Sequence, residues 1–155
     1  MNGKKFEEQF KKSIPNDVFL YRLKDSTATF SNNNTSFAVY NISDFFAFYN
    51  NKLFFLELKC HKGKSLPFNC IRKTQIDEMI KASKYNNIES YIVINFYENN
   101  NDVIFFVDIN DVYKEMQKGK RKSLSIEVCY EKAILVSKYK KRINEYYNLD
   151  EFFKK

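Results

Sequence analysis

Apolar side chains recur along the chain with spacings that alternate between helical and extended patterns. Near the amino terminus, Phe6 and Phe10 lie four residues apart among charged neighbours, which predicts a short amphipathic helix that ends before Pro15. Residues 18–23 follow as a short apolar segment and predict a strand. Residues 24–35 are polar, as is typical of a loop or an exposed hairpin.

Two pairs of dense apolar segments predict two strand pairs. Residues 37–50 and 53–59 flank Asn50 and Asn51, and because Asn tolerates a positive φ, this pattern predicts a β-hairpin. Both faces of that hairpin carry apolar side chains, so we expect a covering layer on each side. Residues 91–97 and 103–107 flank a second Asn-rich segment and predict a second pair. We expect the phenylalanines of the first hairpin in the core: Phe45, Phe46, Phe48, Phe54 and Phe55.

The remaining segments are predicted to be helical or mixed. Residues 73–85 place Ile76 and Met79 on one face and offer Thr74 as an N-cap, which predicts a helix. Residues 112–116 indicate a short helix, residues 126–136 fit a helix or a strand, and residues 143–153 indicate a partly helical end. Strands alternating with helices favour an α/β layered domain.

Length and composition narrow the class of protein. The 155 residues fit a single domain over 1–155, and a 44% hydrophobic content with 17% aromatic residues excludes a disordered chain. A net charge of +7 favours a polyanionic partner. The apolar runs fall far short of the ~20 residues of a membrane helix. Because the amino terminus also lacks an apolar leader, we expect a cytoplasmic protein with reduced cysteines and no membrane partner.

Two carboxylates are predicted to meet on one face of the first hairpin. If its turn is centred on Asn50 and Asn51, Asp44 lies opposite Glu57, and directly opposed Cβ atoms are roughly 4.5 to 5.5 Å apart. Lys59 is two residues beyond Glu57 and points to the same side. Two close carboxylates need a compensating cation, and Mg²⁺ with a nearby ammonium suits phosphodiester hydrolysis. Periodicity leaves one alternative, in which Asp44 caps a strand and Glu57 with Lys59 is a solvated ion pair.

Several motifs together resemble a nuclease family. Ser43-Asp44, followed after twelve residues by Glu57-Leu58-Lys59, resembles the D-x(n)-E-x-K signature of the PD-(D/E)xK nuclease superfamily. The string Gly3-Lys4-Lys5-Phe6-Glu7 resembles the G-x-x-F-E start of the first helix in RecU-type Holliday junction resolvases. Residues 64–68 and 74–79 resemble the basic S-F-P segment and the H-Q-I-x-x-M helix start of that family. Order and spacing agree over residues 3–112.

The resemblance implies a restriction-endonuclease-like core, an α/β fold with a central mixed β-sheet flanked by helices. It implies that Asp44, Glu57 and the Leu58 carbonyl bind Mg²⁺, for which Mn²⁺ is a possible substitute, and that Lys59 assists the attacking water. Glu7 would add a third carboxylate, and Gln75 would reach the site from its helix. We expect DNA contacts from residues around the motif, against the alternative of an ordinary basic surface: Ser43, Lys62, Lys64, Arg72 and Lys73.

The implied function is a Mg²⁺-dependent endonuclease, a homodimer that resolves four-way junctions or other branched DNA in recombination and repair. The family's long projection into the junction would have only residues 24–40 available here. A restriction-type or flap nuclease of the same superfamily is therefore one alternative, and a non-catalytic DNA-binding or recombinase-regulating module is another. Cys60, His61, Cys70 and Cys129 lack the paired spacing of structural zinc sites.

Overall fold

The computed structural model describes residues 2–24, 41–98 and 101–155. Their elements, in chain order, are α1 (Gly3–Lys12), β1 (Phe19–Arg22), β2 (Phe45–Tyr49), β3 (Lys52–Lys62), β4 (Ser65–Pro67), the 3₁₀ turn η1 (Phe68–Cys70), α2 (Lys73–Ala82), β5 (Ile88–Glu98), β6 (Asn101–Asp108), α3 (Ile109–Gln117), β7 (Ser123–Ser125), α4 (Ile126–Lys132), β8 (Ile134–Val136), β9 (Lys138–Lys141), β10 (Asn144–Tyr147) and α5 (Asp150–Phe153). In these ranges no helix is both long and apolar enough to cross a bilayer. The predictions for residues 25–40 lie outside the described residues.

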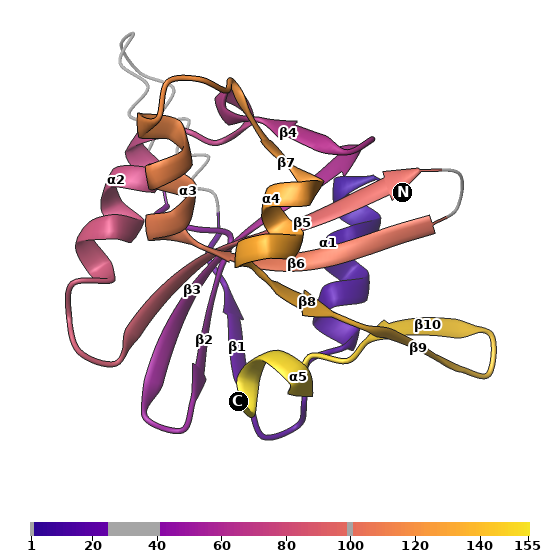
Figure 1. Ribbon diagram of the computed structural model, residues 1–155. Coiled ribbons are helices and arrows are strands. Elements are labelled where there is room, and N and C mark those ends of the chain that lie inside the picture. Colours follow the sequence, from indigo (N-terminus) through magenta and orange to yellow (C-terminus); the bar gives the residue numbers. More distant parts are fainter. Residues whose placement is uncertain (1, 25–40, 99–100) are drawn as a thin grey trace, which may run out of the picture.

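A six-stranded mixed sheet, in the order β1-β2-β3-β5-β6-β8, forms the centre of the fold (Figure 1). Neighbouring strands are antiparallel except β3 and β5, which are parallel and are connected through α2. Separate two-stranded ladders join β4 to β7 and β9 to β10. The sheet therefore combines two hairpins around one parallel crossover, in agreement with both predicted strand pairs.

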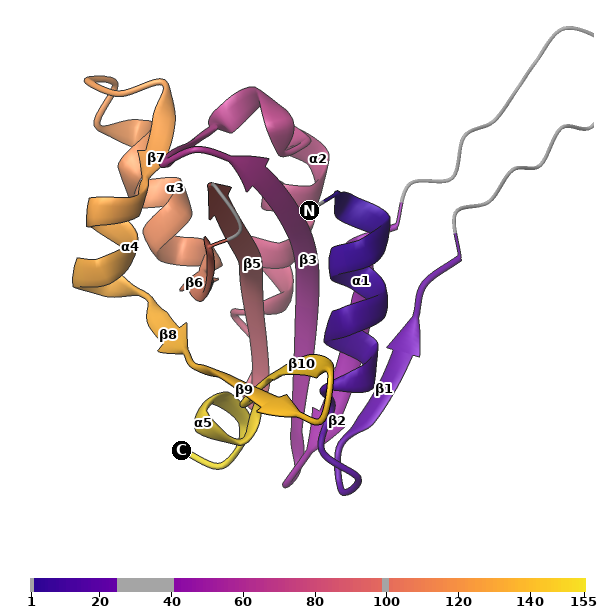
Figure 2. The ribbon, with the colours of Figure 1, turned by 90° about the vertical axis from the view of Figure 1, so that its right-hand side faces the viewer.

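Helices cover the sheet on both sides, because successive residues of the central strands point to opposite faces. Tyr91 and Val93 of β5 pack in a cluster with α1 and α5, whereas Ile92 and Ile94 pack in a second cluster with α2, α3 and α4. Figure 2 shows α1 and α2 on opposite sides of β3. The expected covering layer on each face is confirmed.

The β2–β3 hairpin has the predicted register. Asn50 and Asn51 have φ values of 47° and 60°, the left-handed conformation that a two-residue turn of this type requires. Pairing then runs from Tyr49 opposite Lys52 to Phe45 opposite Leu56. Asp44 directly precedes this ladder, on the side of the sheet that faces α2.

One local prediction is corrected, and two are made more specific. The N-cap of α2 is Arg72, whose backbone is extended, so Thr74 lies inside the helix. Residues 126–136 contain both α4 and β8, since Ala133 is extended and ends the helix. The segment 143–153 is partly helical, as predicted, with β10 before α5.

The first hairpin is also less completely buried than predicted. Phe45 and Phe54 are buried, but Phe48 is 47% exposed and Phe46 is only half-buried. Phe46 and Phe48 lie on the face of β2 that looks away from α1. That face carries exposed aromatic side chains at this edge of the sheet, as Phe19 and Tyr21 of β1 are also exposed.

Candidate active site

Asp44 and Glu57 lie side by side at the start of β2 and in the middle of β3. Phe45 and Leu56, which pair at the end of the hairpin ladder, pack toward α1, so alternation turns their neighbours Asp44 and Glu57 toward α2, where Gln75 contacts Glu57. The backbone N–H of Leu58 donates to Asp44 Oδ2 at 2.8 Å, which fixes the aspartate against β3. The predicted convergence of these two residues therefore agrees with the geometry of the hairpin.

Glu57 is the more deeply buried of the two carboxylates, with 1% of its surface exposed. Its Oε1 accepts a hydrogen bond from Lys59 Nζ at 2.7 Å. Its Oε2 accepts one from Gln75 Nε2 on α2 at 2.9 Å. Both oxygens are thus held, one by an ammonium on the same strand and one by an amide from the covering helix.

Gln75 is itself buried, with 3% of its surface exposed. Among the described residues its Oε1 has no hydrogen-bond partner. A buried acceptor without a donor is costly unless a ligand, ion or water satisfies it. This oxygen belongs to the side chain that holds Glu57, so the site contains an acceptor that is not used within the protein.

Burial makes the charged forms of both carboxylates unfavourable. It raises the pKa of Asp44, against the opposing effects of the Leu58 N–H and of Lys59. Burial, followed by the negative charge of Asp44, raises the pKa of Glu57, while Lys59 and Arg72 act in the opposite direction. A pair of desolvated carboxylates that repel each other is an arrangement that a cation stabilises.

Glu7, the third carboxylate expected at the site, is held by two cations. It lies on α1, which packs on the other face of the sheet, and its Oε1 contacts Arg22 Nε at 2.5 Å and Lys11 Nζ at 3.1 Å. Partial burial acts to raise the pKa of Glu7, but the hydrogen bonds from Arg22 and Lys11 outweigh it and the pKa is lowered. In the described part of the chain, no three Asp, Glu, His or Cys side chains converge on one point. The charge of Glu7 nevertheless acts on Asp44, and the role of Glu7 as a third carboxylate stays a prediction.

Arg22 is a site neighbour that the sequence patterns missed. It lies opposite Phe45 in the β1–β2 ladder, and its charge lowers the pKa of Asp44 whereas Glu7 raises it. One signal in the sequence was available, because Arg22 is a single cation in the otherwise apolar segment 18–23. The charges of Glu7 on α1 and Arg22 on the edge strand β1 therefore both affect the pKa of Asp44.

Four of the five expected DNA contacts are exposed cations on the segments that follow Lys59, and the charge of one of them, Arg72, acts on Glu57. Lys62 ends β3, Lys64 follows the turn at Gly63, and Arg72 and Lys73 begin α2. Ser43 is different, because it is buried with 1% exposure and its hydroxyl donates to the Phe45 carbonyl at 2.7 Å. Ser43 fixes the start of β2, a placement that does not fit the DNA contact expected of it.

The oxygen donors of the site fit a hard divalent cation. Mg²⁺ is commonly bound by one or two carboxylates, with water and phosphate oxygens in its other positions. Asp44 and Glu57 supply the two carboxylates, and the unpaired Gln75 Oε1 shows that the enclosed site has acceptor capacity left over. The residues present are therefore compatible with the implied Mg²⁺.

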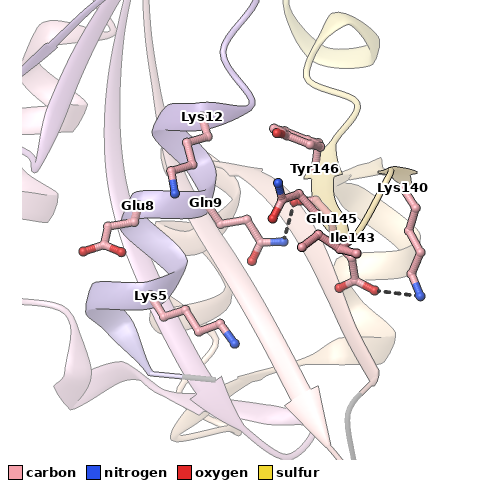
Figure 3. A pocket seen from close by; sticks show the side chains of 9 residues that line it. Lys5, Glu8, Gln9, Lys12, Lys140, Ile143, Glu145 and Tyr146 are labelled. Carbon is pink, nitrogen blue, oxygen red and sulfur yellow. Dashed lines mark hydrogen bonds and ion pairs between the residues drawn. The ribbon is translucent and has the colours of Figure 1, made fainter.

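A groove of about 520 Å³ lies elsewhere, between α1 and the β9–β10 hairpin (Figure 3). Its walls carry both signs of charge, from Lys5, Glu8 and Lys140 among others. Gln9 Nε2 donates across the groove to the Glu145 carbonyl at 3.2 Å. No residue of the predicted site lines it, so this hollow is separate from the carboxylate pair.

Comparison with known proteins identifies the family. Residues 5–151 match the family model of Recombination protein U, RecU. The chain belongs to the RecU family. The SPbeta prophage-derived uncharacterized protein YotM of Bacillus subtilis (strain 168) is 33% identical over 164 residues, which cover 96% of this chain and 83% of YotM.

A solved structure shares the fold. Hjc from Archaeoglobus fulgidus, a Holliday junction resolvase from an archaeal hyperthermophile, aligns with a TM-score of 0.51 over 83% of this chain and 89% of Hjc, at 10% sequence identity. The RecU resemblance and the α/β fold with a central mixed sheet, both predicted from the sequence, are thereby confirmed.

Proposed function

We propose that this RecU-family protein is a metal-dependent endodeoxyribonuclease of the cytoplasm that resolves Holliday junctions or other branched DNA by phosphodiester hydrolysis. The observation that carries the proposal is the buried Glu57 carboxylate, which binds the Lys59 ammonium and lies beside the half-buried Asp44. RecU-family membership supports a role in recombination, and the fold shared with a Holliday junction resolvase supports a nuclease of this type.

Asp44, Glu57 and the Leu58 carbonyl would hold the metal, Mg²⁺ or its substitute Mn²⁺. When bound there, the ion supplies an acidified water and a positive charge beside the scissile phosphate. Lys59, 22% exposed at its side chain, is partly open to substrate while Glu57 holds its ammonium. Lys59 would position the attacking water and stabilise the negative charge that develops on the phosphate.

Gln75 and Glu7 would act on the carboxylates rather than on the DNA. The Gln75 amide holds Glu57 Oε2 and so fixes the orientation of that carboxylate. Glu7, bound by Arg22, lies close enough to Asp44 to affect its pKa. We assign both residues to the positioning and charge balance of the pair. The exposed Lys62, Lys64, Arg72 and Lys73 would neutralise backbone phosphates without reading sequence.

The exposed aromatic face at the sheet edge supports a homodimer. Phe19, Tyr21 and Phe48 are 57%, 46% and 47% exposed, and Tyr21 stacks on Phe46 at 5.3 Å between ring centroids. Adjacent aromatic groups of this kind often mark a protein interface. A second copy would cover this face and supply the second site that two symmetric nicks require. Light scattering of Tyr21→Lys and Phe48→Lys tests this, and a dimer that persists in both variants would contradict this interface.

A cleavage assay tests the catalytic proposal. The protein is incubated with Mg²⁺ and a labelled four-way junction, a flap and a linear duplex of matched sequence. We expect faster cutting of the junction, and loss of cleavage in Asp44→Asn and Glu57→Gln. Glu89→Gln is the matched control, because Glu89 is also a strand glutamate held by a lysine, Lys52, at 2.7 Å. Variants of Asp44 and Glu57 that cut like the control would disprove the site assignment.

The same assay separates the rival functions. Equal rates on linear duplex or flap and on the junction would favour a restriction-type or flap nuclease. Absence of cleavage, together with no heat of Mg²⁺ or Mn²⁺ binding in calorimetry, would favour a non-catalytic DNA-binding or recombinase-regulating module.

A further inference from the structure

We propose that residues 118–122, the loop between α3 and β7, form a second contact with the DNA backbone, beside the basic residues of β3 and α2. This inference rests on the proposed function and extends its DNA-binding surface. Four of the five loop residues are cationic: Lys118, Lys120, Arg121 and Lys122. All four are exposed. The motifs by which the sequence resembles RecU-type resolvases lie at residues 3–7, 43–59, 64–68 and 74–79 and do not include these four cations.

The β4–β7 ladder brings this loop to the predicted DNA-binding segment. Ser65 pairs with Ser125 and Pro67 with Ser123, more than fifty positions away in the chain. At the two ends of the ladder, Ile126 N donates to the Lys64 carbonyl at 2.8 Å and Phe68 N donates to the Lys122 carbonyl at 3.1 Å. The loop is thus attached to the segment that connects Lys62 and Lys64 with Arg72 and Lys73.

The base of the loop is held by a buried carboxylate. Glu115 Oε1 accepts from Lys118 Nζ and from Lys132 Nζ, each at 2.6 Å, and only 6% of the Glu115 side chain is exposed. Glu115 therefore neutralises the first cation of the loop and fixes its start. The next three cations, Lys120, Arg121 and Lys122, have no ion pair with a carboxylate in the described ranges.

The free charges of the loop add to the field of the β3–α2 segment. The pKa of Glu127 is lowered mainly by hydrogen bonds from its own backbone N–H and from Ser125, and the charges of Lys64 and Arg121 lower it further, so these two cations from distant segments act on the same carboxylate. Lys and Arg side chains without carboxylate partners are the groups that bind phosphate oxygens of DNA. The partner that fits this surface is the sugar–phosphate backbone of duplex DNA next to the scissile phosphate.

A second basic segment of the same composition lies at another end of the molecule and provides a matched control. Lys140, Lys141 and Arg142 are exposed in the β9–β10 hairpin, which packs against α1. Figures 1 and 2 both show this hairpin far from β4, β7 and the start of α2. Two lysines and one arginine are present in each segment, so equal substitutions change the net charge equally.

The test compares two triple variants, Lys120→Gln/Arg121→Gln/Lys122→Gln and Lys140→Gln/Lys141→Gln/Arg142→Gln. Each removes three positive charges from the net +7. Fluorescence anisotropy with a labelled four-way junction gives the Kd at several salt concentrations. Since each phosphate contact contributes about 0.9 to the slope of log K against log salt, we expect the slope of the loop variant to fall by up to about 2.7 and its Kd at moderate salt to rise at least about tenfold.

The hairpin variant is expected to keep the wild-type salt slope and cleavage rate. Equal losses of affinity in the two triple variants, or no loss in the loop variant, would overturn the inference. All six substituted residues are exposed, so thermal melts should agree within about 0.5 kcal/mol in stability. Wild-type protein that neither binds nor cuts DNA would refute the proposed function itself, whereas wild-type activity with an unaffected loop variant would refute only the loop contact.

Discussion

The carboxylate pair is expected to destabilise the metal-free protein, so Glu57→Gln should raise its stability while it abolishes cleavage. The raised pKa of Glu57 means that its ionised carboxylate lowers the stability of the folded state, so its removal should raise that stability. Burial and the charge of Asp44 together outweigh the opposing effects of Lys59 and Arg72 on the pKa of Glu57, so the charged carboxylate is disfavoured in the folded state. Gln has nearly the same shape and an oxygen that still accepts a hydrogen bond, but it carries no charge.

The magnitude follows from the charges that the substitution removes. At the roughly 5 Å spacing typical of directly opposed strand residues, two carboxylates repel by about 3 kcal/mol at an effective dielectric constant of about 20. Loss of the partly exposed ion pair between Glu57 and Lys59 offsets about 1 kcal/mol of that relief. The expected net gain is about 1 to 2 kcal/mol, which for a chain of this length raises Tm by about 2 to 8 °C.

Differential scanning fluorimetry in EDTA, at a pH where carboxylates are ionised, measures the effect. Saturating Mg²⁺ should then stabilise the wild type by about 2.7 kcal/mol at 100 times its Kd, and should leave Glu57→Gln almost unchanged. Glu89→Gln again serves as the control and should gain nothing in EDTA. A lower Tm for Glu57→Gln than for the wild type would refute the reasoning, because it would mean that the folded protein favours the charged carboxylate.

Three further predictions concern the site, the loop anchor and the core. Lys59→Met should lower the single-turnover cleavage rate at least about 100-fold and also lower the Tm of the metal-free protein, because it removes the cation that compensates the carboxylates. A gel assay measures the rate and a thermal melt measures the Tm. An unchanged cleavage rate would exclude Lys59 from catalysis. Hydrogen bonds from Lys118 and Lys132 lower the pKa of Glu115 to about 2. The stabilisation from this lowered pKa is complete above the ordinary carboxyl pKa of about 4.5 and is lost as the pH falls toward 2, so in urea melts at pH 6 and pH 3 the wild type should lose more stability than Glu115→Gln. Equal losses in the two proteins would contradict this assignment. Phe152→Ala should lower the free energy of unfolding in urea by about 3 to 5 kcal/mol, because Phe152 is 5% exposed and packs against four other aromatic rings. The control Ile143→Ala, at a residue that is 94% exposed, should lower it by less than about 0.5 kcal/mol. Similar losses at the two positions would show that α5 does not anchor the core.

The β2–β3 hairpin was predictable because its register depends on a few adjacent residues. Asn50 and Asn51 can adopt positive φ, and a two-residue turn fixes every pair up to Phe45 and Leu56. The position of Asp44 relative to Glu57 then follows. This explains why the central feature of the site could be read from a segment of fourteen residues, from 44 to 57.

Features that depend on contacts between distant segments could not be predicted in the same way. The local capping rule selected Thr74, but Ile71 is buried with 3% exposure, and the extended backbone at Ile71 and Arg72 places the helix start at Lys73. The bond between Arg22 and Glu7 joins β1 to α1 and has no local pattern. Packing of one element on another decided both cases.

The position of the excess positive charge is the clearest example of a feature that depends on contacts between distant segments. Composition gives the net charge, but it does not show which cations are neutralised. Many lysines pair with carboxylates, including Lys81 with Glu78 and Lys132 with Glu115. In the described ranges, six cations without an ion pair to a carboxylate lie on β3, in the turn before β4, on α2 and in the 118–122 loop: Lys62, Lys64, Lys73, Lys120, Arg121 and Lys122. Because β4–β7 pairing joins the 118–122 loop to the connection between β3 and α2, the unpaired charge gathers along the strand and the helix that carry Glu57, Lys59 and Gln75, and it would draw a phosphate backbone toward them.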